Sequence, residues 1–497
     1  MASDYMCAGA RTVNDILENF YRDPHRGFTN NFTRLDLSNF FSQTCNSFLH
    51  SFGQNLPKSK KVGIKDTKAM DKYIKAEVKL LKNMRQRLIF TKTKLVVDSG
   101  GYEVSKGRLD EDQSRVLDQM YHRFLYNHCR DYDRAFTLDF VPGQGKNPKF
   151  FKDFNDIYYW NLRSYTRAAS LPESVRHKIV YIHHFRTPAL WKIFMKIMRD
   201  NNLFKEFKYH GTGGMVANLA SDANTPCITY ILPLIPLLNE AIKDNRDYLY
   251  FHVLGIGNPR DIFFYEFFKT HVKKVHNIDL HISYDSAGAM FHQLLNARYI
   301  PVYDRVNDMI VKMYLKTNEL TKRFGRKDKL VIDTYNDEIN KMAHKYKFLK
   351  IPIRDISDVY QVCKICGGAG TNGVGKQCSE CHSSGWGTFY DNIKVYSMLY
   401  SIESVREIQE VSKYHSDKLY PLYEAGELEE FNREVELVTR KFNHERITRK
   451  QKAKTNSLIR SLDMLSSLDE DHCEYIVNRY LAKDEFKHLD PSCPLKF

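Results

Sequence analysis

The feature that most constrains the fold is a series of short, apolar, β-rich segments that end in small or polar residues. The segments are residues 94–101, 135–140, 177–185, 206–214, 248–257 and 279–288. Helical patterns follow them, and segments that are apolar on both faces are typical of parallel strands covered by helices. Their spacing, about 30 to 45 residues, matches repeated βα units. We therefore predict an α/β fold, an eight-stranded (β/α) barrel of the TIM type, with a doubly wound parallel sheet as the alternative.

Two of the expected helices carry clear start signals. Thr187 precedes Pro188, and Asn258 precedes Pro259 with Asp261 close behind. A capping side chain followed by a first-turn proline is a typical helix start.

The chain on either side of these segments differs in composition. We expect a basic leader with the start of the barrel at residues 1–90, the barrel core at 91–300, a charged helical insertion at 301–355, a zinc-binding loop at 356–392 and a basic helical extension at 393–497. Lysines and arginines crowd the stretch from Lys58 to Arg87. Such a run forms either a solvated helix face or a surface that faces nucleic acid.

Four of the ten cysteines form two Cys-x2-Cys pairs. The pairs are Cys363 with Cys366 and Cys378 with Cys381, and His382 follows the last cysteine. Each pair can form a tight knuckle with two thiolates directed at one ion, and two knuckles supply the tetrahedral sulfur set that Zn2+ prefers. We predict a structural zinc site at these cysteines, with His382 as a substitute ligand.

The charge of the chain favours an anionic partner. Lys and Arg number 75 against 60 Asp and Glu, which gives a formal net charge of +15. Nucleic acid is the first expectation for such a protein, and a solvated basic surface is the alternative. The most apolar stretch, residues 228–242, contains two prolines and is shorter than the roughly 20 residues that span a bilayer. With no secretory signal visible, we expect a cytoplasmic protein that does not bind membranes.

Aspartates follow three of the expected strands, at Asp98, Asp139 and Asp285. In both candidate folds the carboxyl ends of the strands carry the chemistry. One carboxylate can act as a nucleophile at a glycosidic carbon while a second transfers protons. The alternative for each aspartate is a helix cap or a salt bridge in a loop.

Four motifs, in this order along the chain, resemble those of the queuine and archaeosine tRNA-guanine transglycosylases. VVDSGGYEV resembles their DSGGF-Q motif, YHGTGG their glycine pair, HVLGIGNPRDI their G-x-G-x-P-x-D segment and SYDSAG the archaeal-type FDSAS around the nucleophile. A cysteine-rich zinc loop follows the barrel core in that family as well. The resemblance covers roughly residues 91–400.

The resemblance implies exchange of guanine for a 7-deazaguanine at C1′ through a covalent enzyme–nucleic acid intermediate. It places Asp285 as the nucleophile and Asp98 as the general acid/base. Asp139 matches the aspartate that accepts hydrogen bonds from the purine N1 and N2 edge, and His183 replaces the glutamine that reads the base carbonyl. The other implied substrate-binding positions are Gly213 and Gly214 in the glycine pair, Tyr102 and Leu254 on the two faces of the purine, Ser99, and Gly255 and Gly257 near a phosphate.

Departures from the family pattern favour DNA as the polymer. The usual N-terminal signature of the tRNA enzymes and a C-terminal RNA-binding module are not recognisable. Bacterial members carry a glutamate a few residues after the glycine pair, where this chain has Leu219, which favours the neutral 7-cyano-7-deazaguanine as the incoming base. The sequence is therefore most similar to the branch, found in phages and bacterial gene clusters, that modifies DNA and protects phage genomes from restriction; a phage protein would act in the host cytoplasm.

Two other functions remain open, which are base exchange in tRNA and a zinc-containing nucleic-acid-binding protein without activity. The free 7-deazaguanine base is the expected small-molecule partner, and a homodimer is allowed.

Overall fold

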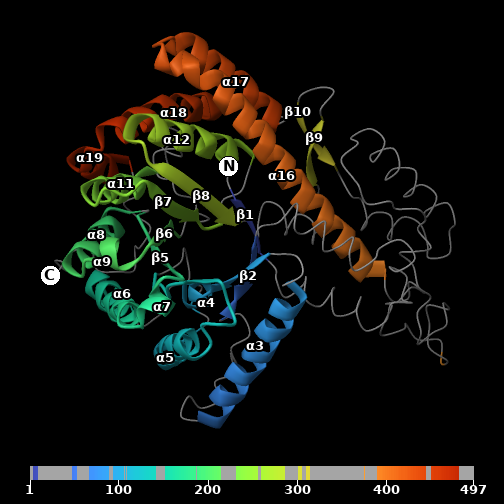
Figure 1. The fold of residues 1–497 in the computed structure, drawn as a ribbon, viewed down its shortest axis with the longest axis vertical. Coiled ribbons are helices and arrows are strands. Elements are labelled where there is room, and N and C mark those ends of the chain that lie inside the picture. The colour runs from blue at the N-terminus through green and yellow to red at the C-terminus, as the bar shows by residue number, and fades with distance from the viewer. Residues whose placement is uncertain are drawn as a thin grey trace.

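Eight parallel strands form the centre of the fold (Figure 1). They are β1 (Asp4–Ala8), β2 (Ser47–Ser51), β3 (Lys94–Asp98), β4 (Arg134–Phe136), β5 (Ile179–His183), β6 (Tyr209–Thr212), β7 (Tyr248–Val253) and β8 (Asp279–Asp285). Each pairs with the next, and β1 also pairs with β8, so the sheet closes into a barrel. The predicted α/β class with a parallel sheet is confirmed, and the doubly wound alternative is excluded by the closure.

The computed structural model describes a large part of the chain. The described residues are 4–8, 47–52, 67–88, 93–105, 107, 109–141, 151–185, 187–213, 231–255, 259–285, 300–304, 309–313, 374, 389–443 and 449–480. Each of the six segments expected to be strands contains or overlaps one. The first two strands of the barrel come from the predicted leader.

Side chains on both faces of the strands are buried, as expected for a parallel sheet covered by helices. On β5, Val180 and Ile182 belong to a small cluster inside the barrel, whereas Tyr181 packs in the larger layer between sheet and helices. Tyr250 on β7 is inside and its neighbour Phe251 is outside. This alternation decides which strand residues can reach the interior of the barrel.

A cation lies among aromatic rings inside the barrel. The Arg134 guanidinium lies 4.4 Å from the ring centre of Tyr209 and 4.2 Å from that of Tyr250. Arg134 begins β4, Tyr209 begins β6, and Tyr250 is the third residue of β7 and pairs with Tyr209. These three side chains therefore fill the interior near the amino ends of the strands, at the opposite end from the predicted site.

Helices surround the sheet between successive strands (Figure 1). They are α3 (Thr67–Leu88), α4 (Gly101–Ser105), α5 (Glu111–Asn127), α6 (Phe154–Ala169), α7 (Glu173–Arg176), α8 (Pro188–Asp200), α9 (Leu203–Glu206), α11 (Leu234–Lys243) and α12 (Pro259–His276). The start predicted for α8 is confirmed, because Thr187 Oγ1 accepts a hydrogen bond of 3.2 Å from the Leu190 amide. The helix predicted to begin at Pro259 is present as well.

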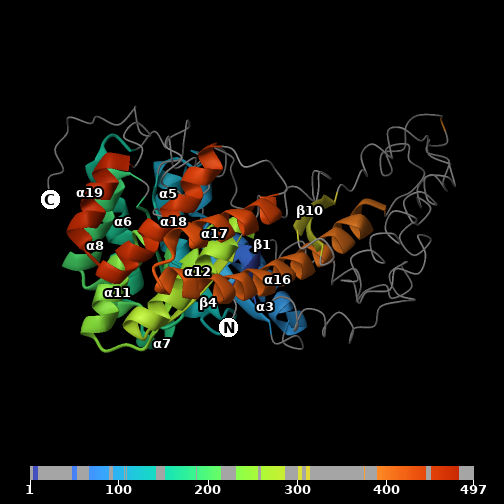
Figure 2. The same cartoon turned by 90° about the horizontal axis from the view of Figure 1, so that it is seen from above.

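The described part of the extension after the barrel is helical, as predicted. It contains α16 (Phe389–Glu424), α17 (Leu428–Asn443), α18 (Arg449–Ser467) and α19 (Glu470–Tyr480). Helices α16 and α17 pack alongside α12, and Figure 2 shows α16 continuing beyond the barrel. The predicted extension is thus part of the outer helical layer.

The start of the predicted helical insertion is different in the structure. Strands β9 (Ile300–Asp304) and β10 (Met309–Met313) form an antiparallel pair there. The segments IPVYD and MIVKM contain β-branched and apolar residues, which favour a strand over a helix. These strands contact α16 and α17. Within the described part of the chain, no helix is both long enough and apolar enough to cross a membrane.

Candidate active site

Three aspartates meet at the carboxyl end of the barrel. Asp98 is the last residue of β3, Asp285 is the last residue of β8, and Asp139 follows β4. The carboxylates of Asp139 and Asp285 are both near enough to raise the pKa of Asp98. The structure therefore brings together the three carboxylates that the sequence placed at strand ends.

Asp98 lies in a setting that disfavours its charged form. The pKa of Asp98 is raised from 3.8 to about 6, chiefly by burial and also by the neighbouring charges of Asp139 and Asp285. Hydrogen bonds from the Ser51 hydroxyl and the Gly100 backbone act in the opposite direction. A carboxyl group with a pKa near 6 can both donate and accept a proton close to neutral pH.

Asp139 is held by a histidine that directly follows the neighbouring strand β5. Its Oδ2 lies 2.6 Å from Nε2 of His184, whose side chain is almost fully buried. Two glycines make room for this pair. A Cβ on Gly101 would lie 2.5 Å from Asp139 Oδ1, and a Cβ on Gly213 would lie 2.6 Å from Cε1 of His184. Neither glycine can carry a side chain without displacing the pair.

Asp285 is oriented by two groups on or just after β7. The Gly255 amide donates to Oδ1 at 2.8 Å, and His252 Nε2 lies 3.3 Å from the same atom. His252 is fully buried, and its Nδ1 lies 2.9 Å from the Ser283 hydroxyl. Among the described residues, both hydrogen-bonding contacts of the Asp285 carboxylate go to Oδ1.

Further polar contacts connect His252 with Arg134 and the two tyrosine rings around it. The Ser283 hydroxyl donates to the Tyr250 hydroxyl at 2.5 Å, and Tyr250 in turn contacts Arg134. A chain of polar groups therefore connects Arg134, near the amino ends of the strands, with Asp285 at their carboxyl ends. It fixes the His252 ring from the side opposite the carboxylate.

His183 lies on the other side of β5 from the aspartates. Its ring is fully buried between Phe185, at 4.7 Å, and Tyr181, at 5.7 Å, and neither ring nitrogen has a hydrogen-bond partner among the described residues. Burial lowers its pKa well below the usual value, which keeps the ring neutral. The predicted role of reading a base in the mouth does not fit this placement, whereas the adjacent His184 contacts Asp139 directly.

Of the remaining predicted site residues, the structure describes some and not others. Ser99 is fully buried, and its hydroxyl accepts from the Gly101 amide at 3.4 Å, so it supports the turn after β3. Leu254 is half-buried against the interior cluster. Tyr102 belongs to α4, but its side chain lies outside the description, as do Gly214, Gly257, Leu219, His382 and the cysteines Cys363, Cys366, Cys378 and Cys381.

Gly255 has a different role from the one predicted. Its amide is directed at Asp285 and is therefore used within the protein. Within the described ranges, no group of three or more histidine, cysteine or acidic side chains is placed to hold a metal ion.

Sequence reasoning did not single out His184, His252 or Ser51. Strand alternation contains the signal for two of them. His252 stands two residues before Leu254, and His184 two residues after Ile182, and both partners face the interior. Ser51 is opposite Asp98 in the register of β2 and β3, which required β2 to be recognised as a strand.

Comparison with known proteins adds no family to this description. No protein-family model matches the chain, and no curated protein matches it.

The environment of Asp98 predicts a pH-dependent stability cost. Because its folded-state pKa of about 6 exceeds the ordinary value of 3.8, ionisation costs the folded state more than the unfolded chain. Wild type therefore loses stability as pH rises from about 4 to above 6. Asp98→Asn has no carboxyl group to ionise at this position and keeps that stability. At about 1.4 kcal/mol per pH unit, the variant should be more stable at pH 8 by at most about 3 kcal/mol.

Denaturant unfolding of both proteins at several pH values measures this difference. The advantage of Asp98→Asn should shrink as pH falls and should vanish below about pH 4. A difference between the two proteins that stays constant with pH would contradict the raised pKa.

Proposed function

We propose that this protein is a DNA-guanine transglycosylase, which exchanges guanine in DNA for a 7-deazaguanine through a covalent aspartyl–C1′ intermediate. The observation that supports the proposal is the meeting of Asp98, Asp139 and Asp285 at one end of the barrel, with the pKa of Asp98 raised to about 6. The incoming base is 7-cyano-7-deazaguanine, and the modified DNA of a phage would resist restriction.

The first half of the reaction uses two of the carboxylates. Asp285 attacks C1′ with a carboxylate oxygen, and the bond from C1′ to N9 breaks with its electron pair moving to the purine. Protonated Asp98 gives its proton to the departing guanine and becomes a carboxylate. Oδ2 of Asp285 suits the attack, because the Gly255 amide and His252 both contact Oδ1.

The second half restores the enzyme. The incoming base transfers its N9 proton to the Asp98 carboxylate, and its nitrogen then attacks C1′. The bond between C1′ and Asp285 breaks, and the carboxylate is released. A single group that first gives and then takes a proton works best with a pKa close to the working pH, which the environment of Asp98 supports.

Recognition of the purine is assigned to Asp139. The N1 and N2 edge of guanine offers two adjacent donors, and a carboxylate accepts both. His184 contacts Oδ2 of Asp139 and orients the carboxylate. A guanine paired in duplex DNA does not expose C1′ or this edge, so the nucleotide must be flipped into the barrel mouth.

Asp285→Asn tests the nucleophile. Wild type incubated with guanine-containing duplex DNA and no incoming base should give a denaturant-resistant protein–DNA adduct, and Asp285→Asn should give none, because a neutral amide is a poor nucleophile. The matched control is Asp279→Asn, at the exposed opposite end of β8, which should form the adduct like wild type. Electrophoresis and mass spectrometry of the adduct make the measurement.

The same experiment with bulk tRNA separates the two polymers. If an adduct formed with tRNA and not with DNA, the substrate would be tRNA. Equal adduct formation by Asp285→Asn and wild type would contradict the role of Asp285.

His252 is a positioning residue in this account. His252→Phe removes the contact to Asp285 Oδ1 and should slow adduct formation by about tenfold to a hundredfold with DNA affinity unchanged. His252→Gln keeps a donor and should recover part of the rate. His183→Phe is the matched control, because His183 is equally buried but has no polar partner among the described residues. Equal losses in His252→Phe and His183→Phe would reduce His252 to a packing role.

The cysteine knuckles are assigned a structural zinc ion. Four thiolates from Cys363, Cys366, Cys378 and Cys381 form the donor set of closed zinc sites, which supply folding energy and no open position for chemistry. Elemental analysis should find about one zinc per chain, and Cys363→Ser should lose it. Metal removal by a chelator should lower the melting temperature of wild type. A gently purified protein that is folded and free of zinc would contradict the site.

A further inference from the structure

Helix α3 has an inner face that is fixed to the barrel. The Tyr73 hydroxyl donates to the Phe52 carbonyl at the end of β2, and Glu77 Oε2 lies 2.7 Å from Nε2 of His50 on β2. Leu81 and Met84 are buried on the same face. These contacts fix the rotation of α3 about its axis and therefore determine which residues point outward.

The outer face of α3 carries a lysine line, made of Lys72, Lys75, Lys79 and Lys82. All four are exposed, and their spacing of three, four and three residues keeps them on one side of the helix. The line is about 15 Å long at 1.5 Å per residue. The ion pairs that α3 forms with other described residues come from Asp71, Glu77 and Arg85, not from this line.

Several exposed lysines elsewhere on the molecule lie in ion pairs. Lys243 lies 2.7 Å from Glu240, Lys273 lies 3.1 Å from Asp279, and Lys413 lies 2.5 Å from Asp417. A solvated helix face usually mixes charges in this way. The lysine line instead presents a row of like charges with no carboxylate of the described residues bound to it.

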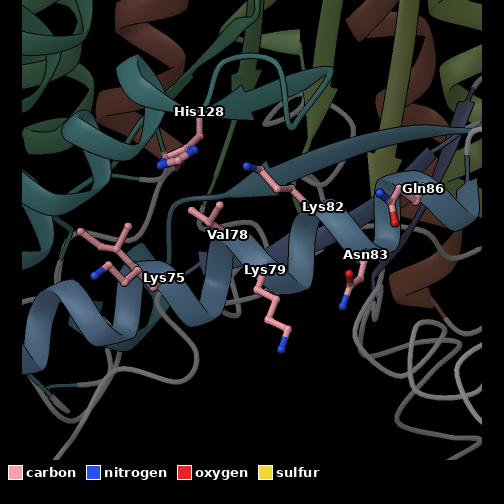
Figure 3. A pocket seen from close by; sticks show the side chains of 8 residues that line it. Lys75, Val78, Lys79, Lys82, Asn83, Gln86 and His128 are labelled. Atoms are coloured by element: carbon pink, nitrogen blue, oxygen red, sulfur yellow. The ribbon is translucent and has the colours of Figure 1, made fainter.

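A groove runs beside this line between α3 and the end of α5. Figure 3 shows the side chains that line it, and the full set is Ile74, Lys75, Val78, Lys79, Lys82, Asn83, Gln86 and His128. Its apolar floor comes from Ile74 and Val78, whereas the amides of Asn83 and Gln86 can donate to anionic oxygens. The groove thus combines positive charge with neutral donors in one depression.

Helix α3 leads from the side of the barrel mouth to the groove, whose His128 end lies toward the amino ends of the strands. The helix follows β2, whose last residue Ser51 contacts Asp98, and precedes β3. A helix between two parallel strands returns along the outside of the barrel, so the lysine line leads from the mouth down the wall.

We propose that the lysine line and its groove bind the phosphate backbone of duplex DNA. Regularly spaced ammonium groups match a regularly charged polymer, and neutral amides add hydrogen bonds to phosphate oxygens. The choice of DNA rests on the proposed function, whereas the recognition of phosphodiesters rests on the surface alone. The site holds the duplex against the outer wall of the barrel and carries no base specificity.

The test is a charge-neutralising triple variant, Lys75→Gln, Lys79→Gln and Lys82→Gln, measured by fluorescence anisotropy with a labelled DNA duplex. Affinity should fall roughly a hundredfold near 100 mM salt, and the slope of log K against log salt should become shallower by about 2 to 3. The matched control is Lys205→Gln, Lys243→Gln and Lys273→Gln, which removes the same charge from exposed but paired lysines and should change both quantities little.

Equal losses in the two triple variants would overturn the proposal, because only net charge would then matter. A loss confined to tRNA, measured in a parallel titration, would also overturn it. Thermal unfolding of both variants tests whether they are folded. The titration needs no base exchange, so a surface that binds DNA in a protein that forms no adduct would refute the proposed function and leave this inference standing.

Discussion

The pairing of β1 with β8 is the interaction on which the rest of the structure depends. It closes the sheet and sets Met6 beside Asp285, so the last strand ends next to the first. Closure brings the carboxyl ends of β3, β4 and β8 around one opening, although their aspartates are far apart in the sequence. An open sheet would leave Asp98 and Asp285 at distant positions, and their charges would not interact as they do here.

Three carboxylates around one opening repel each other, and the barrel offsets this with polar neighbours from adjacent strands. Ser51 bonds to Asp98, His184 lies against Asp139, and Gly255 donates to Asp285. The compensation is uneven. Asp98 keeps a raised pKa, whereas the contacts of Asp285 with described residues both go to Oδ1.

The sequence predicted the fold and the acids well because both depend on local patterns. Apolar segments with following helices are visible without tertiary information, and an aspartate at a strand end needs only the strand to be recognised. To place the histidines, the face of the strand on which each side chain lies must also be known. His183 and His184 are neighbours that point to opposite sides of the sheet. An error of one residue therefore moves the predicted side chain from the barrel mouth to the outer layer. The hairpin after β8 was missed because its charged surroundings resemble a helix, and its strands gain their support from α16 and α17.

Nucleoside analysis of DNA treated with the protein tests the central claim most directly, namely that the aspartates at the mouth exchange a base. Duplex DNA and tRNA are incubated separately with 7-cyano-7-deazaguanine, digested and examined by mass spectrometry. The account predicts the 7-deazaguanine nucleoside in DNA, with one free guanine released for each base inserted. Unmodified DNA with modified tRNA, or no exchange in either polymer by a folded and zinc-loaded protein, would contradict it.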